Sequence, residues 1–205
     1  AHALAYVRER GIGDEILSSF RIGFAPDDGR WLYQFLRSKS YSPEFLAETG
    51  LFSKNHPELS IFRNRVIFPI IDERGKVRGF GGRALDPDAR AKYINSPDTA
   101  AYNKKRTLFG LNQAVGPARK RNEIVLCEGY IDAIALHIAG VTHAVAPLGT
   151  AFTDEQARLV KRWVESVVIL FDSDDAGRSA TLRAAIAAEG RGFSVRCVRL
   201  PDGMD

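Results

Sequence analysis

The sequence predicts an α/β protein in which a mostly parallel sheet, flanked by helices, follows a mixed α+β subdomain that is rich in basic residues. From about residue 123 on, short apolar segments alternate with segments of helical period. Residues 61–121 hold 14 Lys and Arg against 5 Asp and Glu, whereas the remainder holds 15 basic and 20 acidic residues. We therefore expect two domains, 1–115 and 116–205.

The N-terminal part begins with short helices. Residues 3–10 have a helical period. Ser42, Pro43 and Glu44 supply a helix cap, a proline at the first helical position and a first-turn acid, and Gly50 ends that helix.

A hairpin pattern follows these helices. Residues 65–71 are apolar and β-branched, D-E-R-G is turn chemistry, and K-V-R-G-F-G-G-R completes the pattern. Pro69 lacks a backbone N–H, so the first strand is expected at a sheet edge or at a bulge. Residues 84–112 are polar and are expected to be irregular.

The C-terminal part alternates strands and helices. We expect strands at 124–127, 143–147, 166–171 and 193–200, with helices at 130–139, 153–163 and 176–189. Thr153 and Gln156 form a capping-box pattern at the start of the second helix. This alternation predicts a parallel sheet with crossover helices.

Composition limits the class of protein. No apolar run of about 18 residues could span a membrane, and the first ten residues are too charged for a signal peptide. We expect a cytoplasmic protein without a membrane partner. Cys127 and Cys197 lie in apolar runs and are expected to be buried, reduced thiols. Two cysteines and four histidines argue against a structural zinc site within this chain.

Acidic residues follow the predicted strands. Glu128 follows the first of the four strands, and Asp172 and Asp174 follow the third. Ligands of parallel sheets bind beyond the carboxyl ends of the strands, so these acids converge if the two strands are neighbours. Crowded carboxylates repel one another unless a cation neutralises them, and oxygen ligands suit Mg²⁺ or Mn²⁺. We therefore predict a metal site.

Aspartates are also common at helix starts. Asp174 and Asp175 could cap the helix at 176–189, and Asp132 could be a first-turn acid. We favour the helix-start role for Asp132 and Asp175, and metal binding for the convergent set. His137 lies on a predicted helix and is expected to be structural.

The basic region indicates a polyanionic partner, most simply nucleic acid or nucleotide phosphates, although a solvated basic surface is the alternative. The sequence contains no phosphate-binding G-x-x-x-x-G-K-[ST] motif and no G-x-S-x-G motif. Gly79–Arg83, G-F-G-G-R, does not match the dinucleotide motif G-x-G-x-x-G.

The motifs E-G-Y-I-D (128–132), P-L-G-T-A (147–151) and D-S-D-D-A-G-R (172–178) resemble the Toprim domain. Upstream, F-R-N-R-V-I-F-P-I, G-F-G-G-R and K-Y-I-N-S-P-D-T resemble motifs of the polymerase core of bacterial DnaG-type DNA primases, and L-P-D-G-M-D at the end resembles the next one. The resemblance covers essentially the whole chain.

This resemblance implies a Toprim-type sheet and a DNA-dependent RNA polymerase. Such an enzyme synthesises short RNA primers on single-stranded DNA by nucleotidyl transfer that depends on Mg²⁺ or Mn²⁺. The implied partners are the DNA template, the RNA primer and ribonucleoside triphosphates. A zinc-binding domain is expected before Ala1 and a domain that binds the replicative helicase after Asp205, so the chain is expected to be a fragment, with zinc only in the preceding domain.

The resemblance also implies roles for single residues. Glu128, Asp172 and Asp174 match the catalytic metal-site acids, and Glu128 is either a ligand or a base. Asp132 matches a further acid of the first motif, and Asp205 matches a metal-site acid of the last. Residues matching positions that contact template, primer or nucleotide phosphates are Arg63, Arg83, Lys92, Asn95 and Lys104. We expect Lys92 and Lys104 to meet the triphosphate and Arg63 to meet the template.

Several positions depart from the family pattern. Ser173 stands where a glycine is usual, which could tighten or shift the site, and Ile61 stands where a basic residue is common. Two other functions remain open: a Toprim strand-cleaving enzyme, such as a topoisomerase or nuclease, and a non-catalytic nucleic-acid-binding module. Metal binding would separate the last from both enzymes.

Overall fold

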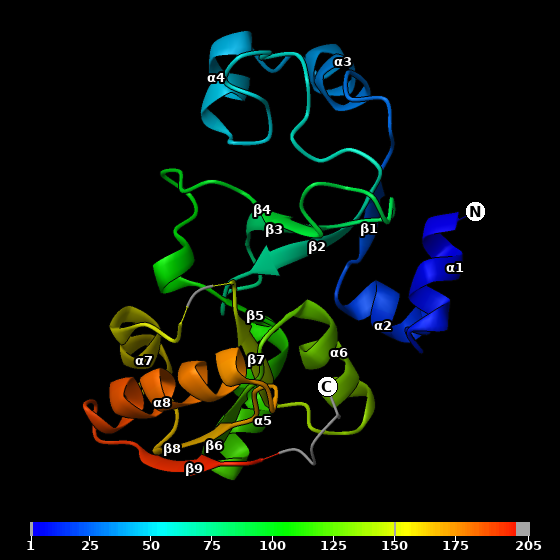
Figure 1. The fold of residues 1–205 in the computed structure, drawn as a ribbon. Coiled ribbons are helices and arrows are strands. Elements are labelled where there is room, and N and C mark those ends of the chain that lie inside the picture. The colour runs from blue at the N-terminus through cyan, green and yellow to red at the C-terminus, as the bar shows by residue number, and fades with distance from the viewer. Residues whose placement is uncertain (1, 150, 200–205) are drawn as a thin grey trace. The chain divides into compact units, whose positions relative to one another are not determined.

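The computed structural model describes residues 2–149 and 151–199 of the chain. Contacts divide the chain into two compact units (Figure 1). The first unit is Ala1–Pro69 with Arg78–Asn103, and the second unit is Ile70–Val77 with Lys104–Asp205. Among the described helices, none is both long enough and apolar enough to cross a membrane.

Short helices and a four-stranded sheet make up the N-terminal part. The helices are α1 (His2–Glu9), α2 (Asp14–Ser19), α3 (Trp31–Ser38) and α4 (Pro43–Glu48). The strands are β1 (Gly23–Ala25), β2 (Arg65–Ile71), β3 (Val77–Ala84) and β4 (Tyr93–Asn95), in the order β1-β2-β3-β4. The predicted cap of α4 is present, because the Ser42 side chain accepts a hydrogen bond from the Phe45 N–H.

The prediction that Pro69 lies on an edge strand is wrong, because its strand, β2, lies between β1 and β3 in the sheet. However, β1 pairs only with residues 65–67 of β2. Pro69 lies beyond the last of these pairs, where its missing N–H removes no hydrogen bond to β1.

The prediction that residues 84–112 are irregular is wrong in part. This region contains β4, the 3₁₀ helix η1 (Lys104–Arg106), β5 (Leu108–Phe109) and the start of α5 (Leu111–Arg121). Sequence reasoning missed α5 because Pro117 lies inside it, and proline removes a helical hydrogen bond. The buried side chains of Leu111, Ala114 and Ala118 hold the helix in place.

The second unit contains the predicted alternation of strands and helices. Its strands are β6 (Glu123–Leu126), β7 (Ala144–Pro147), β8 (Ser166–Ile169) and β9 (Ser194–Cys197), and its helices are α6 (Tyr130–Ile138), α7 (Asp154–Val160) and α8 (Asp175–Glu189). The sheet order is β5-β7-β6-β8-β9, parallel throughout except for β5. The fold class is confirmed, and the first and third predicted strands, β6 and β8, are neighbours.

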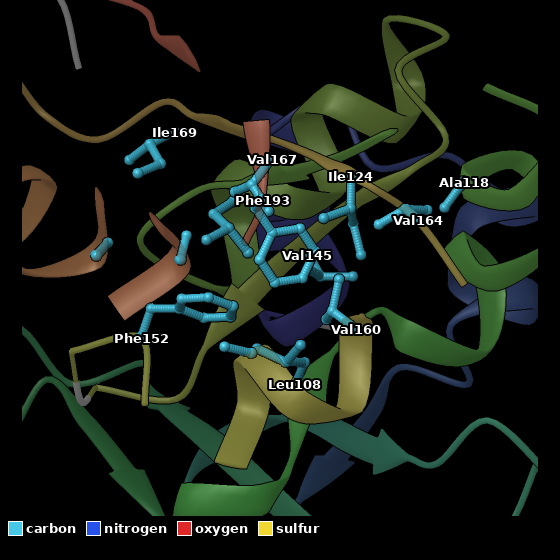
Figure 2. Close-up of a cluster of buried hydrophobic side chains, with 14 of the residues drawn as sticks. Leu108, Ala118, Ile124, Val145, Phe152, Val160, Val164, Val167, Ile169 and Phe193 are labelled. Atoms are coloured by element: carbon cyan, nitrogen blue, oxygen red, sulfur yellow. The ribbon is translucent and has the colours of Figure 1, made fainter. Parts of the chain in front are cut away.

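Helices cover both faces of this sheet. Ile124 and Leu126 belong to a buried cluster that includes side chains of α5, α7 and α8. Figure 2 shows Ile124 in this cluster together with Ala118 of α5 and Val160 of α7. Val125 and Val168 lie on the opposite face, where Leu136 of α6 packs against them. Alternate residues of each central strand are therefore buried on opposite faces, which explains why the strands are continuously apolar.

The two cysteines differ in burial. Cys127 is buried as expected, but the expectation for Cys197 is wrong, because this thiol is exposed. Cys197 lies on β9, the edge strand of the sheet, where three of the four residues are exposed.

A buried glutamine joins the start of α7 to the basic segment η1. The predicted capping box is present: Thr153 Oγ1 accepts from Gln156 N at 3.1 Å, and Gln156 Oε1 accepts from Thr153 N at 3.0 Å. The Gln156 side chain is fully buried, and its Nε2 donates to the carbonyls of Lys104 (3.1 Å) and Thr107 (2.7 Å).

We predict that Gln156→Leu lowers the free energy of unfolding by about 2–4 kcal/mol, because two carbonyls lose their buried donor. Urea denaturation followed by circular dichroism measures this difference. Gln34→Leu is the matched control, because Gln34 is exposed on α3 and its replacement should change stability little. Equal losses for the two variants would contradict the role given to Gln156.

Candidate active site

Two acidic residues, Glu128 and Asp172, come into contact just beyond the ends of β6 and β8. The strands are parallel with Leu126 opposite Ile169, and the Leu170 N–H extends the pairing by donating to the Leu126 carbonyl at 2.8 Å. Both chains therefore leave the sheet at the same edge. There Glu128 Oε1 accepts a hydrogen bond of 3.0 Å from the Asp172 N–H.

Three further acids lie at the starts of helices. Asp174 is the N-cap of α8, and its Oδ1 accepts from the Gly177 N–H at 2.7 Å. Asp132 lies in the first turn of α6, and its Oδ2 accepts from the Gly129 N–H at 2.8 Å. Asp175, in the first turn of α8, pairs with Arg178. The structure thus gives Asp132, Asp174 and Asp175 helix-start contacts.

Glu128 lies in a partly buried and acidic environment. Burial raises the pKa of Glu128, and the nearby carboxylates of Asp172, Asp132 and Asp174 raise it further. The hydrogen bond from the Asp172 N–H opposes this shift by stabilising the ionised form. At neutral pH such a cluster attracts a cation, because a positive charge would offset the mutual repulsion.

The carboxylates of these acids are suitable ligands for a hard divalent cation, but their side chains are not arranged to coordinate one. Across residues 2–149 and 151–199, no three His, Cys, Asp or Glu side chains form a group that could hold a metal ion as they stand. Their donors are carboxylate oxygens, which Mg²⁺ and Mn²⁺ prefer. An ionised carboxylate offers about four lone-pair positions, so one hydrogen bond to Glu128 or Asp174 leaves room for a cation. Asp205 lies outside the described residues.

Gly177 is a residue of this site that sequence reasoning missed. A Cβ atom at this position would lie 2.2 Å from the Asp172 carbonyl oxygen and 2.9 Å from Glu128 Oε1. A glycine is therefore required at position 177, because any side chain would prevent the first turn of α8 from packing against Asp172 and Glu128. The signal was present in the sequence, as the glycine that ends D-S-D-D-A-G.

A hollow of about 200 Å³ opens beside Asp172. Arg178, Arg199 and the exposed Cys197 contribute to its lining, so two arginines line the same hollow as Asp172. Ser173 also lines it and is not among the described non-glycine residues with positive φ. Its backbone conformation is therefore open to any residue, and the usual glycine is not required here.

Lys104 belongs to the same unit as the acids. It begins η1, and its carbonyl accepts from Gln156 while the Lys105 carbonyl accepts from Thr153 Oγ1 at 2.6 Å. The backbone of this basic segment is therefore fixed to the start of α7.

The other four predicted phosphate-contact residues belong to the first unit. Arg63 is exposed, with its Nε donating to the Asp27 carbonyl at 3.2 Å. The Arg83 guanidinium lies 5.4 Å from the ring centres of both Tyr6 and Tyr93. Lys92 is exposed just before β4, and Asn95 ends β4 opposite Gly81.

His137 has a structural role, as expected. Its ring is buried, and Nε2 lies 2.9 Å from the Ala144 carbonyl. Burial lowers the pKa of His137, which favours the neutral ring.

Comparison with known families assigns the chain. The family model of the DNA primase catalytic core, N-terminal domain, matches residues 1–115. The chain belongs to the DNA primase catalytic-core family. A Toprim-like model matches residues 125–205, the part of this primase-family chain that carries the acids.

Relatives of known name and structure agree with this assignment. The DNA primase of Treponema pallidum (strain Nichols) is 45% identical over 205 residues, which are 100% of this chain and 34% of that protein. The chain thus spans about a third of the length of the curated primases that it matches. Crystallised zinc-binding and RNA polymerase domains of the Aquifex aeolicus primase are 38% identical, with a TM-score of 0.91 over 99% of this chain and 50% of that chain. A DnaG primase catalytic domain bound to single-stranded DNA is 36% identical, with a TM-score of 0.88 over 100% of this chain and 67% of that chain.

We predict that Gly177→Ala lowers the free energy of unfolding by about 1–3 kcal/mol, because the new methyl group overlaps the Asp172 carbonyl. Gly23→Ala is the control, since its Cβ would meet no atom within 4 Å; it should raise stability by about 0.4–1 kcal/mol. Denaturant titrations of both variants measure these values. Tolerance of alanine at both positions would show that the close approach at Gly177 is not a constraint.

The raised pKa of Glu128 makes the stability of the protein depend on pH. Because the pKa of Glu128 is raised above its ordinary value of 4.5, its ionised form costs more in the folded than in the unfolded state. Glu128→Gln should therefore raise the Tm of the metal-free protein near neutral pH, while its amide oxygen can still accept from the Asp172 N–H.

This gain in Tm should shrink as the pH falls through the raised pKa. It should vanish below 4.5, where both states of the wild type are protonated at Glu128. Thermal melts in chelator across this pH range measure the effect. Glu9→Gln, a change of an exposed acid at the end of α1, is the control and should show no comparable gain. A pH-independent difference would refute the electrostatic explanation.

Proposed function

We propose that the chain is the RNA polymerase core of a DNA primase, which synthesises short RNA primers on single-stranded DNA by nucleotidyl transfer. The contact between Glu128 and Asp172 at the shared end of two parallel strands carries this proposal, because it places a repelling acid cluster in the Toprim-like part of a primase-family chain. Named relatives and a similar catalytic domain bound to single-stranded DNA support it.

The proposal includes a divalent cation, Mg²⁺ or Mn²⁺, held by Glu128, Asp172 and Asp174, with Asp205 as a further ligand. When bound, it would neutralise negative charge on the reacting phosphates. Glu128 is either one of its ligands or a base, and the raised pKa of Glu128 brings it nearer to the range in which a carboxylate exchanges protons at neutral pH. Asp132 acts indirectly, because it fixes the backbone at Gly129, the residue next to Glu128.

Cationic side chains would bind the phosphates. In the second unit, Lys104 is proposed to meet the nucleotide triphosphate, and Arg178 and Arg199 line the hollow beside Asp172. In the first unit, Arg63, Arg83, Lys92 and Asn95 are proposed to contact template, primer or nucleotide phosphates. Lys92 is expected to meet the triphosphate and Arg63 the template. Arginine suits such contacts because its planar group can donate two parallel hydrogen bonds to phosphate.

Several further features belong to this proposal. The partners would be a single-stranded DNA template, an RNA primer and ribonucleoside triphosphates, with the replicative helicase reached through a further domain. We propose the functional division 1–115 and 116–205, and a cytoplasmic location.

A non-catalytic nucleic-acid-binding module is the second candidate function. It is favoured by the hydrogen bonds that engage Asp132 and Asp174 at helix starts.

The test is incorporation of ribonucleotides onto a supplied primer, with Mg²⁺, Mn²⁺ or chelator. Wild type should incorporate only with a metal, and Asp172→Asn should reduce the rate on the order of 100-fold, since it removes one stabilising charge at the reacting centre. Asp14→Asn, an exposed acid on α2, is the matched control and should keep the wild-type rate.

Two outcomes would contradict the proposal. Full activity of Asp172→Asn would reduce this acid to a helix-start residue. Binding of single-stranded DNA without metal-dependent incorporation by the wild type would favour the non-catalytic module.

A further inference from the structure

A hollow with mostly apolar walls lies wholly within the first unit. Its volume is about 280 Å³, and its lining includes Phe24, Trp31, Leu32, Phe62, Ile67 and Phe80. Phe62 is only 5% exposed and forms the buried part, whereas Phe24 and Trp31 are 43% and 48% exposed. Large aromatic side chains that stay exposed beside an apolar hollow are typical of a binding site.

One aromatic ring of this hollow belongs to a flat stacked pair. The rings of Trp31 and Phe35 lie 5.6 Å apart between centroids, with only 7° between their planes. They are four residues apart on α3, so they project from the same face of the helix. Phe35 is 45% exposed. Trp31, which lines the hollow, and its stacked partner Phe35 are thus both about half exposed, and an exposed planar ring matches the shape of another flat ring.

The charges near this surface suit a polyanion. Between residues 29 and 42 the chain contains Arg30, Arg37 and Lys39 but no acid. The Lys39 ammonium lies 5.6 Å from the centre of the Phe35 ring, so a cation adjoins the stacked pair. Arg21 adds a further exposed cation to the lining of the hollow.

The acids nearby already have cationic or N–H partners. Asp28 lines the hollow, but its Oδ1 accepts from the Arg30 N–H at 2.9 Å. Asp27 lies 3.7 Å from the Arg63 guanidinium, and Glu58 lies 3.7 Å from that of Arg30. These contacts reduce the repulsion that a phosphate would meet at this surface.

We propose that this hollow binds a base of single-stranded DNA, stacked against Trp31, while Arg21 and Lys39 attract the adjoining phosphates. A flat apolar surface bordered by cations fits a base with its phosphates better than it fits an apolar peptide, which would not require the charges. The inference rests on the proposed function, since it adds a template contact that is distinct from the phosphate contacts of Arg63.

Stacking and charge contacts respond differently to salt. Loss of a stacked base contact should weaken binding of oligo(dT) about 5- to 150-fold without changing the slope of affinity against salt. Loss of a phosphate contact should reduce that slope by about one. Trp31→Ala should therefore behave in the first way and Arg63→Ala in the second.

The experiment measures binding of oligo(dT) to the whole chain by anisotropy of a labelled oligonucleotide over a range of salt concentrations. Trp31→Phe should restore most of the affinity that Trp31→Ala loses, because it keeps an aromatic ring. Phe45→Ala is the matched control: Phe45 is 55% exposed and stacks on Tyr41, but it does not line the hollow. Its affinity should equal that of the wild type.

Tryptophan fluorescence gives an independent measurement. The chain has two tryptophans, so in a Trp163→Phe background Trp31 is the only one, and oligo(dT) should quench its emission. Unchanged affinity of Trp31→Ala, or equal losses for Trp31→Ala and Phe45→Ala, would overturn the inference. The inference would also be overturned if a free nucleoside triphosphate quenched the Trp31 emission and oligo(dT) did not displace it.

Failure of this inference can be told apart from failure of the proposed function. If Trp31→Ala binds oligo(dT) normally while the chain still extends a primer, only the stacking site is refuted. If the chain binds oligo(dT) through Trp31 but never incorporates nucleotides, the polymerase assignment fails and the stacking site stands.

Discussion

The candidate site depends on the parallel pairing of β6 with β8. That pairing ends both strands at the same level and brings the Asp172 N–H to the Glu128 carboxylate. The pairing also has an electrostatic cost, because it brings Asp172 and Asp174 toward Glu128. Burial raises the pKa of Glu128, and the carboxylates of Asp172, Asp132 and Asp174 raise it further. A chain selected for stability alone would not gather acids in this way. A cation bound as proposed for these acids would relieve this repulsion.

Other features of the second unit support this arrangement. The absence of a side chain at Gly177 lets α8 begin against the Asp172 carbonyl. The buried Gln156 fixes the carbonyls of Lys104 and Thr107, and so holds a basic segment against the start of α7. Both constraints act on backbone positions. Side chains that handle charge are thereby presented from rigid segments, which lowers the cost of ordering them when a ligand binds.

Much of the second unit could be predicted from its sequence, because its strands are buried on both faces and its helices carry clear periods and caps. The adjacency of β6 and β8 could only be stated as a condition, since strand order depends on long-range packing. The helix α5 was missed because Pro117 disfavours a helix in the local sequence. The burial of Leu111 and Ala114 in the folded protein nevertheless stabilises this helix. The exposure of Cys197 was missed because an edge strand and a covered strand can have the same apolar composition.

The atomic contacts of the site could also be predicted only in part from the sequence. The spacing D-S-D placed Asp172 and Asp174 together, but it could not separate a helix cap from a metal ligand. The structure shows that Asp174 is a cap, and the two roles share one physical basis, because a helix N-terminus and a cation both stabilise a carboxylate. A cap also restricts the rotamers of Asp174, so less side-chain entropy remains to be lost when a cation arrives. Capping by Asp174 is therefore compatible with the metal binding proposed for it.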